Sequence, residues 1–208
     1  MNHPATPSGT TNVAKRQQIL AGARQVFGEL GYERASVDLI AARAGVSKAT
    51  IYSHFGDKTA LFVAAVVLEC EELRSGLAPC LERPPGDVEE GLARLGERIM
   101  TIFLTPSIAR LYRAALAESQ RLPEIGRMVF ERGSLAVQEA VARHLERWHE
   151  SGDLRIDDAR AAAIAFLSLC QGDLATRSRL NVLDHPVEAE IRDTVRRAVR
   201  IFVRAHRP

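Results

Sequence analysis

Apolar residues recur along this chain at helical spacing, and no segment alternates with the two-residue period of a strand. The pattern is sharpest in residues 36–58, where it predicts two short helices joined by a turn. Ser36 and Ser47 can cap the two helices, and Gly45 lies where the chain needs a left-handed residue to leave the first one. The buried positions of the pair are expected to be Val37, Ile40, Ala41, Ile51 and Phe55. We therefore expect an all-α chain with a helix-turn-helix near its N-terminus.

The second of these helices is predicted to carry a slim polar face opposite Ile51 and Phe55. Small side chains point outward there, and longer ones border them. Short side chains let a helix approach base edges in a major groove, while long donors reach phosphates. The residues of this face are Lys48, Ala49, Thr50, Tyr52, Ser53 and His54. Two alternatives stay open, since Tyr52 could be a half-buried core aromatic and His54 could be merely solvated.

The rest of the chain reads as a series of amphipathic helices separated by proline and glycine. With the N-terminal helices, they make about nine. The residues expected to be helical after the helix-turn-helix are 58–81, 88–104, 106–120, 123–150, 157–180 and 187–205. We expect a disordered arm over residues 1–11, a DNA-binding domain over 12–60, and a helical effector-binding and dimerisation domain over 61–208.

The last two expected helices are candidates for a dimer interface. The helix at 157–180 is apolar on most sides, and the final helix sets an apolar stripe against several arginines. The residues assigned to the interface are Phe166, Ile191, Val195, Val199 and Phe202. The alternative is that these residues only close the core of a single chain.

A ligand pocket is expected among the helices between residues 61 and 180, which contribute mostly aliphatic residues and a few aromatics. Such a pocket favours a hydrophobic or aromatic small molecule over a sugar phosphate. Its candidate lining residues are Phe103, Tyr112, Phe130, Trp148, Phe166, Cys170 and Asp173. Each aromatic could instead pack the core, and Asp173 could simply pair with Arg177, one turn further along.

Composition narrows the class of protein. The net charge is +2, but residues 1–60 hold seven basic against four acidic residues, including all three lysines, so the basic surplus lies in the expected DNA-binding domain. The longest apolar run, residues 60–68, is too short to span a bilayer. The first twelve residues do not form a secretory signal, and three cysteines without a CxxC pair fit a reducing cytoplasm.

Chemistry-bearing motifs are not found in the sequence. There is no GxGxxG, GxxxxGK[ST], HExxH or GxSxG, and His144 and His149 are spaced too poorly to form a metal site. We expect no catalytic residue, no metal and no cofactor.

Residues 13–62 resemble the DNA-binding domain of the TetR family of bacterial transcription regulators. The markers are FGELGY at the end of the first helix and GVSKATIYSHFGDKTALF after it. The resemblance implies that Thr50, Tyr52, His54 and Lys58 touch DNA, and that Lys48 and Ala49 set specificity. Asp38 departs from the family, because some relatives have a basic phosphate-binding residue near it. The full set expected at the DNA is Ser36, Ser47, Lys48, Ala49, Thr50, Tyr52, Ser53, His54 and Lys58.

The segment LYRAALAESQRLPEIGRMVFERG is also similar to the C-terminal domain of a subgroup of these regulators. The leading hypothesis is a dimeric repressor that binds an inverted-repeat operator in double-stranded DNA and is released by a small hydrophobic or aromatic effector. One alternative is a DNA-associated adaptor whose second domain binds a protein, which the absence of a cavity would favour. Another is a small helical enzyme, which would need a titratable pair facing a closed pocket.

Overall fold

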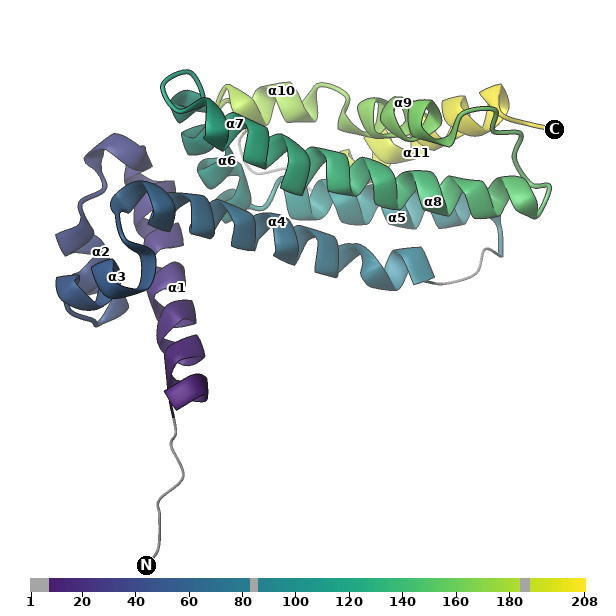
Figure 1. Ribbon diagram of the computed structural model, residues 1–208. Helices are drawn as coiled ribbons and strands as arrows, with labels where there is room; N and C mark the ends of the chain where they lie inside the picture. The colour runs from purple at the N-terminus through teal and green to yellow at the C-terminus, as the bar shows by residue number, and fades with distance from the viewer. Residues whose placement is uncertain (1–7, 83–85, 184–187) are drawn as a thin grey trace, which may run out of the picture.

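The computed structural model describes residues 8–82, 86–183 and 188–208, and that part of the chain is helical without strands (Figure 1). Three helices, α1 to α3, form a small group at one end of a larger bundle made by the later helices. The long helix α4 leads from one to the other. The first helices are α1 (Ser8–Arg34), α2 (Val37–Ala44), α3 (Lys48–Phe55), α4 (Lys58–Glu82) and α5 (Val88–Phe103). They are followed by α6 (Pro106–Glu118), α7 (Pro123–Val129), the π-helix η1 (Phe130–Leu135), α8 (Ala136–Glu150), α9 (Ala159–Gln171), α10 (Leu174–Arg179) and α11 (Glu188–Ala205).

The boundaries of the short helices follow from local chemistry. The hydroxyl of Ser36 accepts a hydrogen bond from the Leu39 N–H at 3.1 Å, and that of Ser47 accepts one from the Thr50 N–H at 3.0 Å. Gly45 ends α2 with φ 63° and ψ 38°, a left-handed conformation that costs glycine little. These caps confirm the predicted helix-turn-helix.

The helices differ from the prediction in three places. Helix α1 begins at Ser8, inside the range expected to be an irregular arm, and residues 1–7 of that range lie outside the described part. The run expected over residues 123–150 is continuous but contains the π-helix η1. The helix expected over 157–180 is broken at Gly172, whose φ of 48° and ψ of −136° cannot continue a helix, so α10 is a separate element.

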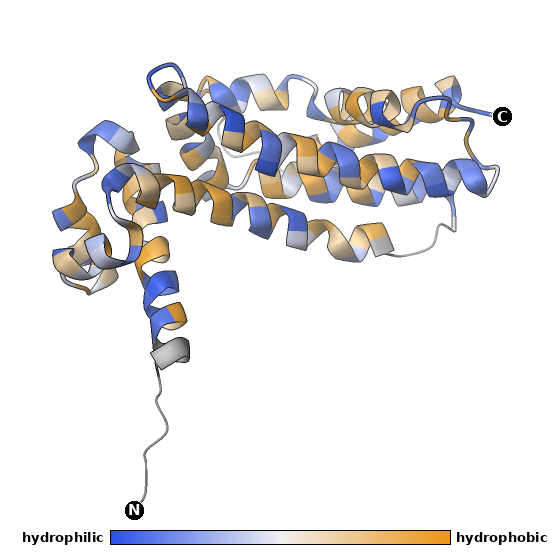
Figure 2. Cartoon of the chain, in the orientation of Figure 1, coloured by the Kyte–Doolittle hydropathy of each residue, from blue (hydrophilic) through white to orange (hydrophobic). Residues whose placement is uncertain are grey.

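Two hydrophobic cores hold the molecule together. One joins α5, α8, α9 and α11, and the other joins the three N-terminal helices to the first half of α4. The second core also takes in Leu111, Ala114 and Ala115 of α6 and Ile125 of α7. Residues of α6 and α7 thus complete the core that the three N-terminal helices form with α4. Figure 2 shows hydrophobic and hydrophilic residues mixed along most helices, as one buried side per helix requires.

The apolar stripe of α11 packs inside its own chain, which contradicts the expectation that it faces a partner. Val195 is fully buried, and Ile191, Val199 and Phe202 are at most 4 % exposed. Phe166 of α9 is also fully buried and meets Phe202 edge-on at 5.3 Å between ring centroids. The periodicity identified a buried face correctly, but α5 and α9 cover it. The apolar side chains that remain exposed on α9 and α11 include Ile164 at 42 % and Ile201 at 56 %.

Candidate nucleic-acid interface and internal pocket

Helix α3 is anchored on one side and open on the other. Ile51 and Phe55 are buried in the N-terminal core, whereas Lys48, Ala49 and Ser53 are exposed and Tyr52 is 43 % exposed. Thr50 and His54 are partly covered. The outer face therefore has the predicted composition, with short side chains at its centre and longer ones beside them. Such a face can enter a major groove without steric obstruction by bulky groups.

The hydroxyls on this helix are held in place by hydrogen bonds within the helix and its N-cap. Ser47 Oγ lies 2.7 Å from Thr50 Oγ1, and Ser53 donates to the Thr50 carbonyl at 2.9 Å. Ser36 and Ser47 are exposed beside their helix N-termini while capping them. The two serines are therefore structural caps, and their N-terminal positions also suit phosphate oxygens.

Both expected lysine contacts have partners within the chain. The Lys48 ammonium donates to Asp38 Oδ2 of α2 at 3.0 Å, and this hydrogen bond raises the pKa of Lys48. The Lys58 ammonium lies 4.4 Å from the centre of the Tyr32 ring and donates to the Glu33 carbonyl at 3.2 Å. Each lysine would have to exchange these partners for phosphate oxygens on binding DNA.

Arg16 of α1 was not among the predicted site residues, although its side chain contacts the C-terminal end of α3. Its guanidinium lies 4.3 Å from the centre of the Phe55 ring and donates to the His54 carbonyl at 3.4 Å. A guanidinium at the C-terminal end of a helix is favourably placed for the helix dipole. Apart from its position next to Lys15, nothing in the sequence pointed to this contact.

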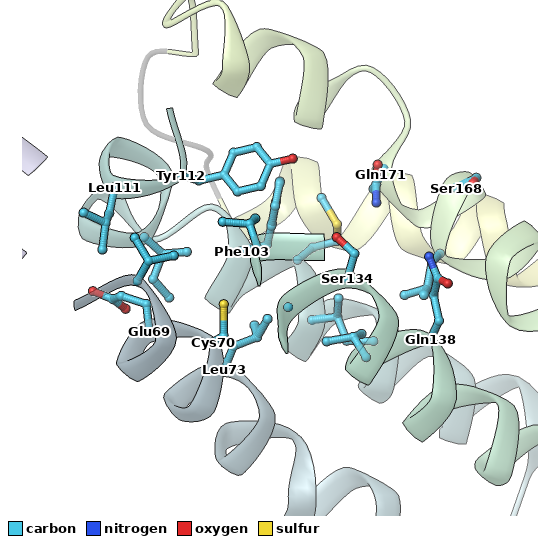
Figure 3. A pocket seen from close by; sticks show the side chains of 18 of the residues that line it. Glu69, Cys70, Leu73, Phe103, Leu111, Tyr112, Ser134, Gln138, Ser168 and Gln171 are labelled. Atoms are coloured by element: carbon cyan, nitrogen blue, oxygen red, sulfur yellow. The ribbon is translucent and has the colours of Figure 1, made fainter. Parts of the chain in front are cut away.

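The larger part of the molecule contains a cavity of about 180 Å³ between α4, α5, α6, η1, α8 and α9 (Figure 3). Its wall is mostly aliphatic and aromatic. Phe103 and Tyr112, which were both predicted, line it with their rings edge-on at 5.7 Å. An engineered cavity of roughly 150 Å³ in another protein binds benzene, so this volume suits an aromatic group of one or two rings.

The other predicted pocket residues do not line this cavity. Trp148, Phe166 and Cys170 are fully buried in the core around α5, α8, α9 and α11, and burial raises the pKa of the Cys170 thiol to about 12. Phe130 is 51 % exposed. Asp173 is exposed and lies 3.7 Å from Arg177, the ordinary pairing that the sequence left open. Aromatic content alone could not separate core residues from lining residues.

The polar residues of the cavity wall were not predicted from the sequence. Gln138, Ser168 and Gln171 lie together at one side in Figure 3, while Glu69 lies beside Leu111 at the other. Single polar residues on amphipathic helices are common, so these residues are a weak signal in a sequence.

Glu69 is the buried charge among them, with only 5 % of its surface exposed. Arg24 of α1 donates to its Oε1 through Nε at 2.7 Å and also pairs with Glu72 at 2.7 Å. Burial raises the pKa of Glu69, while Arg24 acts in the opposite direction. The carboxylate thus connects the cavity wall to the first helix of the DNA-binding domain.

The π-helix η1 forms another part of the wall. Gly133 and Ser134 of η1 line the cavity, and a Cβ atom on Gly133 would lie 3.2 Å from Cys70 Sγ. The missing side chain allows η1 to approach α4 closely. Single π turns of this kind occur often at functional sites.

An exposed helix of the helix-turn-helix type, attached through a long helix to a domain with a largely apolar pocket, is the architecture of a DNA-binding transcription regulator. The chain belongs to the TetR family. Residues 19–65 match the model described as bacterial regulatory proteins of the tetR family, and residues 90–208 match that of the AefR-like transcriptional repressor C-terminal domain. The proteins of this family are transcription regulators and not enzymes.

Individual relatives match this chain over most of their own length. The HTH-type transcriptional regulator YezE of Bacillus subtilis is 29 % identical over 150 residues, covering 71 % of this chain and 76 % of YezE. The solved structure of the Flavonoid-responsive Regulator FrrA is 32 % identical, covers 94 % of this chain and 98 % of its own, and superposes with a TM-score of 0.74. A TetR-family structure from Mesorhizobium loti, 24 % identical, covers 96 % of this chain and 100 % of its own with a TM-score of 0.88, which supports the fold.

In the described ranges, none of the helices combines the length and the apolar character that crossing a bilayer requires.

Proposed function

We propose that the protein is a dimeric repressor that binds an inverted-repeat operator through α3 and leaves it when an aromatic effector enters the cavity. The observation that carries this proposal is the sharing of α4 between the two sites. Its first turn lies beside the recognition helix, and Val66, Glu69, Cys70 and Leu73 further along it line the cavity. One rigid element thus contacts both the ligand and the DNA-binding domain.

The dimer is inferred to form through the outward sides of α9 and α11. Ile164 and Ile201 are exposed there, and Ala161, Ala165 and Ala205 leave room for close helix approach. A second copy placed on this surface would build a four-helix interface of the kind that helical proteins commonly use. Two recognition helices related by a two-fold axis then require half-sites about one turn of DNA, ~34 to 36 Å, or slightly more apart.

The nature of the effector follows from the cavity wall and from one relative. The lining is largely apolar, with amide and hydroxyl groups at its edge, which favours an aromatic ligand over a sugar phosphate. FrrA is named for its response to flavonoids, which are hydroxylated aromatic compounds. We infer an effector of the same general class for this chain.

Release from DNA requires that the effector bind the DNA-incompetent arrangement better. A hundredfold loss of operator affinity corresponds to about 2.7 kcal/mol of coupling. Val66 of α4 and Leu111 of α6 belong both to the cavity wall and to the core of the DNA-binding domain, so displacement of either helix by a ligand is transmitted directly. The cavity also disfavours the adaptor alternative, which was expected to lack one.

The test is calorimetry with a panel of apolar and aromatic compounds, performed on the free protein and on its complex with an operator selected from genomic fragments. An inducer should bind the free protein more tightly than the complex, and it should raise the dissociation constant of the operator by the same factor. Equal affinity of every binding compound for both forms would reject the repressor-release scheme.

A further inference from the structure

The turn between α6 and α7 contacts the end of α1 through Arg121. This turn is built on Glu118, the last residue of α6, whose carbonyl accepts the backbone N–H groups of Arg121 at 3.0 Å and Leu122 at 2.8 Å. The carboxylate of Glu118 also holds the Arg121 side chain, since its Oε2 accepts hydrogen bonds from Nε at 3.2 Å and Nη2 at 3.1 Å. The same Nη2 pairs with Oε1 of Glu33, near the end of α1, at 3.0 Å. Arg121 therefore joins the later helices to the DNA-binding domain.

Tyr32, the neighbour of Glu33 in the chain, brings Arg121 and Lys58 together. The Arg121 guanidinium lies 5.4 Å from the centre of the Tyr32 ring, and the Lys58 ammonium lies 4.4 Å from the same centre. The tyrosine is buried, and its hydroxyl lies 2.7 Å from Thr59 Oγ1, which fixes the ring against the start of α4. Two cations from different parts of the molecule thus share one fixed aromatic ring.

Glu33 contacts both of these cations, but with different groups. Its carboxylate pairs with Arg121, while its backbone carbonyl accepts a hydrogen bond from the Lys58 ammonium at 3.2 Å. The Glu33 side chain is 68 % exposed, so in the absence of Arg121 it can rotate and place its carboxylate on Lys58. A carboxylate is a stronger partner for an ammonium than a carbonyl or a ring, and its charge also repels phosphate. Lys58 would then be less able to bind DNA.

We propose that Arg121 is a positioning residue for the contact of Lys58 with DNA: it holds the carboxylate of Glu33 away from Lys58, so that the ammonium can exchange its neutral partners for a phosphate. This inference rests on the proposed DNA-binding function and extends it to a residue outside the helix-turn-helix. Leu111 and Tyr112 of α6, the helix that leads into this turn, line the cavity. Arg121 thus brings a charge from the cavity-bearing part of the molecule to the DNA-binding domain.

The test is a double-mutant cycle on Arg121 and Glu33 in the full chain, read by fluorescence anisotropy with an operator selected from genomic fragments. Arg121→Ala should bind the operator severalfold more weakly at low salt. The slope of log K against log salt should become shallower by up to about 1.8 for a dimer, since each lost phosphate contact removes about 0.9. Glu33→Gln should raise the affinity severalfold more in the Arg121→Ala background than in the wild type, and should restore the slope there. Both proteins compared in that background lack Arg121, so any loss of folding caused by unpaired Glu118 is common to them.

Three further variants separate this role from a purely structural one. Arg121→Lys keeps a cation beside Glu33 and should retain most of the affinity. Arg94→Ala is the matched control, because it removes the same charge from an exposed pair with Glu90 on α5, and it should leave the slope unchanged. In a Lys58→Ala background, Arg121→Ala should have little further effect, because the contact on which it acts is already lost. Thermal unfolding is measured on the same preparations.

Three results would overturn the inference. The first is wild-type affinity and slope in Arg121→Ala. The second is a loss that Glu33→Gln does not relieve, which would make Arg121 itself a phosphate contact or a residue needed only for folding. The third is an equal loss in the Lys58→Ala background. If the wild type binds no DNA fragment, the proposed DNA-binding function itself fails, and the inference fails with it.

Discussion

Asp38→Asn is expected to strengthen DNA binding by releasing Lys48. The wild-type ammonium donates to Asp38 Oδ2 at 3.0 Å, and both side chains are well exposed, at 49 % for Lys48 and 69 % for Asp38. An exposed pair of this kind contributes little to folding, so the variant should keep its thermal stability. Removing the carboxylate leaves Lys48 free to contact a phosphate and removes a negative charge beside Lys48 at the start of α3.

The size of the effect follows from counterion release. Each added phosphate contact increases the steepness of log K against log salt by about 0.9, so a dimer with two freed lysines gains about 1.8. Between 50 and 200 mM salt the variant should therefore lose roughly twelvefold more affinity than the wild type, while binding more tightly at low salt. Fluorescence anisotropy with a fixed operator across this salt range measures both quantities.

Glu29→Gln is the control, because it makes the same change in net charge. It breaks the exposed pair between Arg43 of α2 and Glu29 of α1, joined at 3.1 Å. This variant should leave the slope close to that of the wild type, and Asp38→Asn combined with Lys48→Ala should lose the gain. An unchanged slope in Asp38→Asn, or equal changes in both single variants, would refute the argument.

Three further outcomes are expected. Ala165→Glu with Ile201→Glu should give a folded monomer with weak operator binding in sedimentation and anisotropy, while Leu116→Glu, at a position that is also exposed, should remain dimeric. An intact dimer of the double variant would place the interface elsewhere. Phe202→Ala should cost about 3 to 5 kcal/mol in urea unfolding because the ring is 1 % exposed and packs within its own chain, and a cost well below 1 kcal/mol would contradict that packing. Cys70 should be alkylated slowly at pH 8 and faster as the pH rises. Burial raises its pKa to about 11, which leaves on the order of one thiolate in a thousand at pH 8. Mass spectrometry of the labelled peptide checks this, and rapid labelling at pH 8 would disprove it.

Local chemistry made the helix-turn-helix predictable from the sequence. Ser36, Gly45 and Ser47 act within a few residues of the chain, so their caps and turn could be read without knowledge of the rest. Ile51 and Phe55 were placed correctly for the same reason, because a short helix between two caps has one possible phase. The outward position of Lys48, Ala49 and Ser53 followed from that phase.

Packing between distant parts of the chain was harder to predict from the sequence. Periodicity showed that one side of α11 is apolar, but it could not show that α5 and α9, and not a second chain, cover Val195 and Phe202. Gly172 was visible inside the expected helix, yet a single glycine is often tolerated there, so the break was not predicted. The partly buried pair of Glu69 and Arg24 joins residues 45 apart, and no local pattern brings them together.

Selection of bound fragments from random DNA tests the central claim most directly, performed in parallel with the wild type and Ala49→Gln. Ala49 is exposed at the outer face of α3, where a longer side chain would reach base edges. The account predicts an inverted repeat for the wild type, and for Ala49→Gln a repeat of the same spacing whose bases change symmetrically in both half-sites. Recovery of asymmetric single half-sites, or of identical sequences for both proteins, would contradict a symmetric regulator that reads DNA through α3.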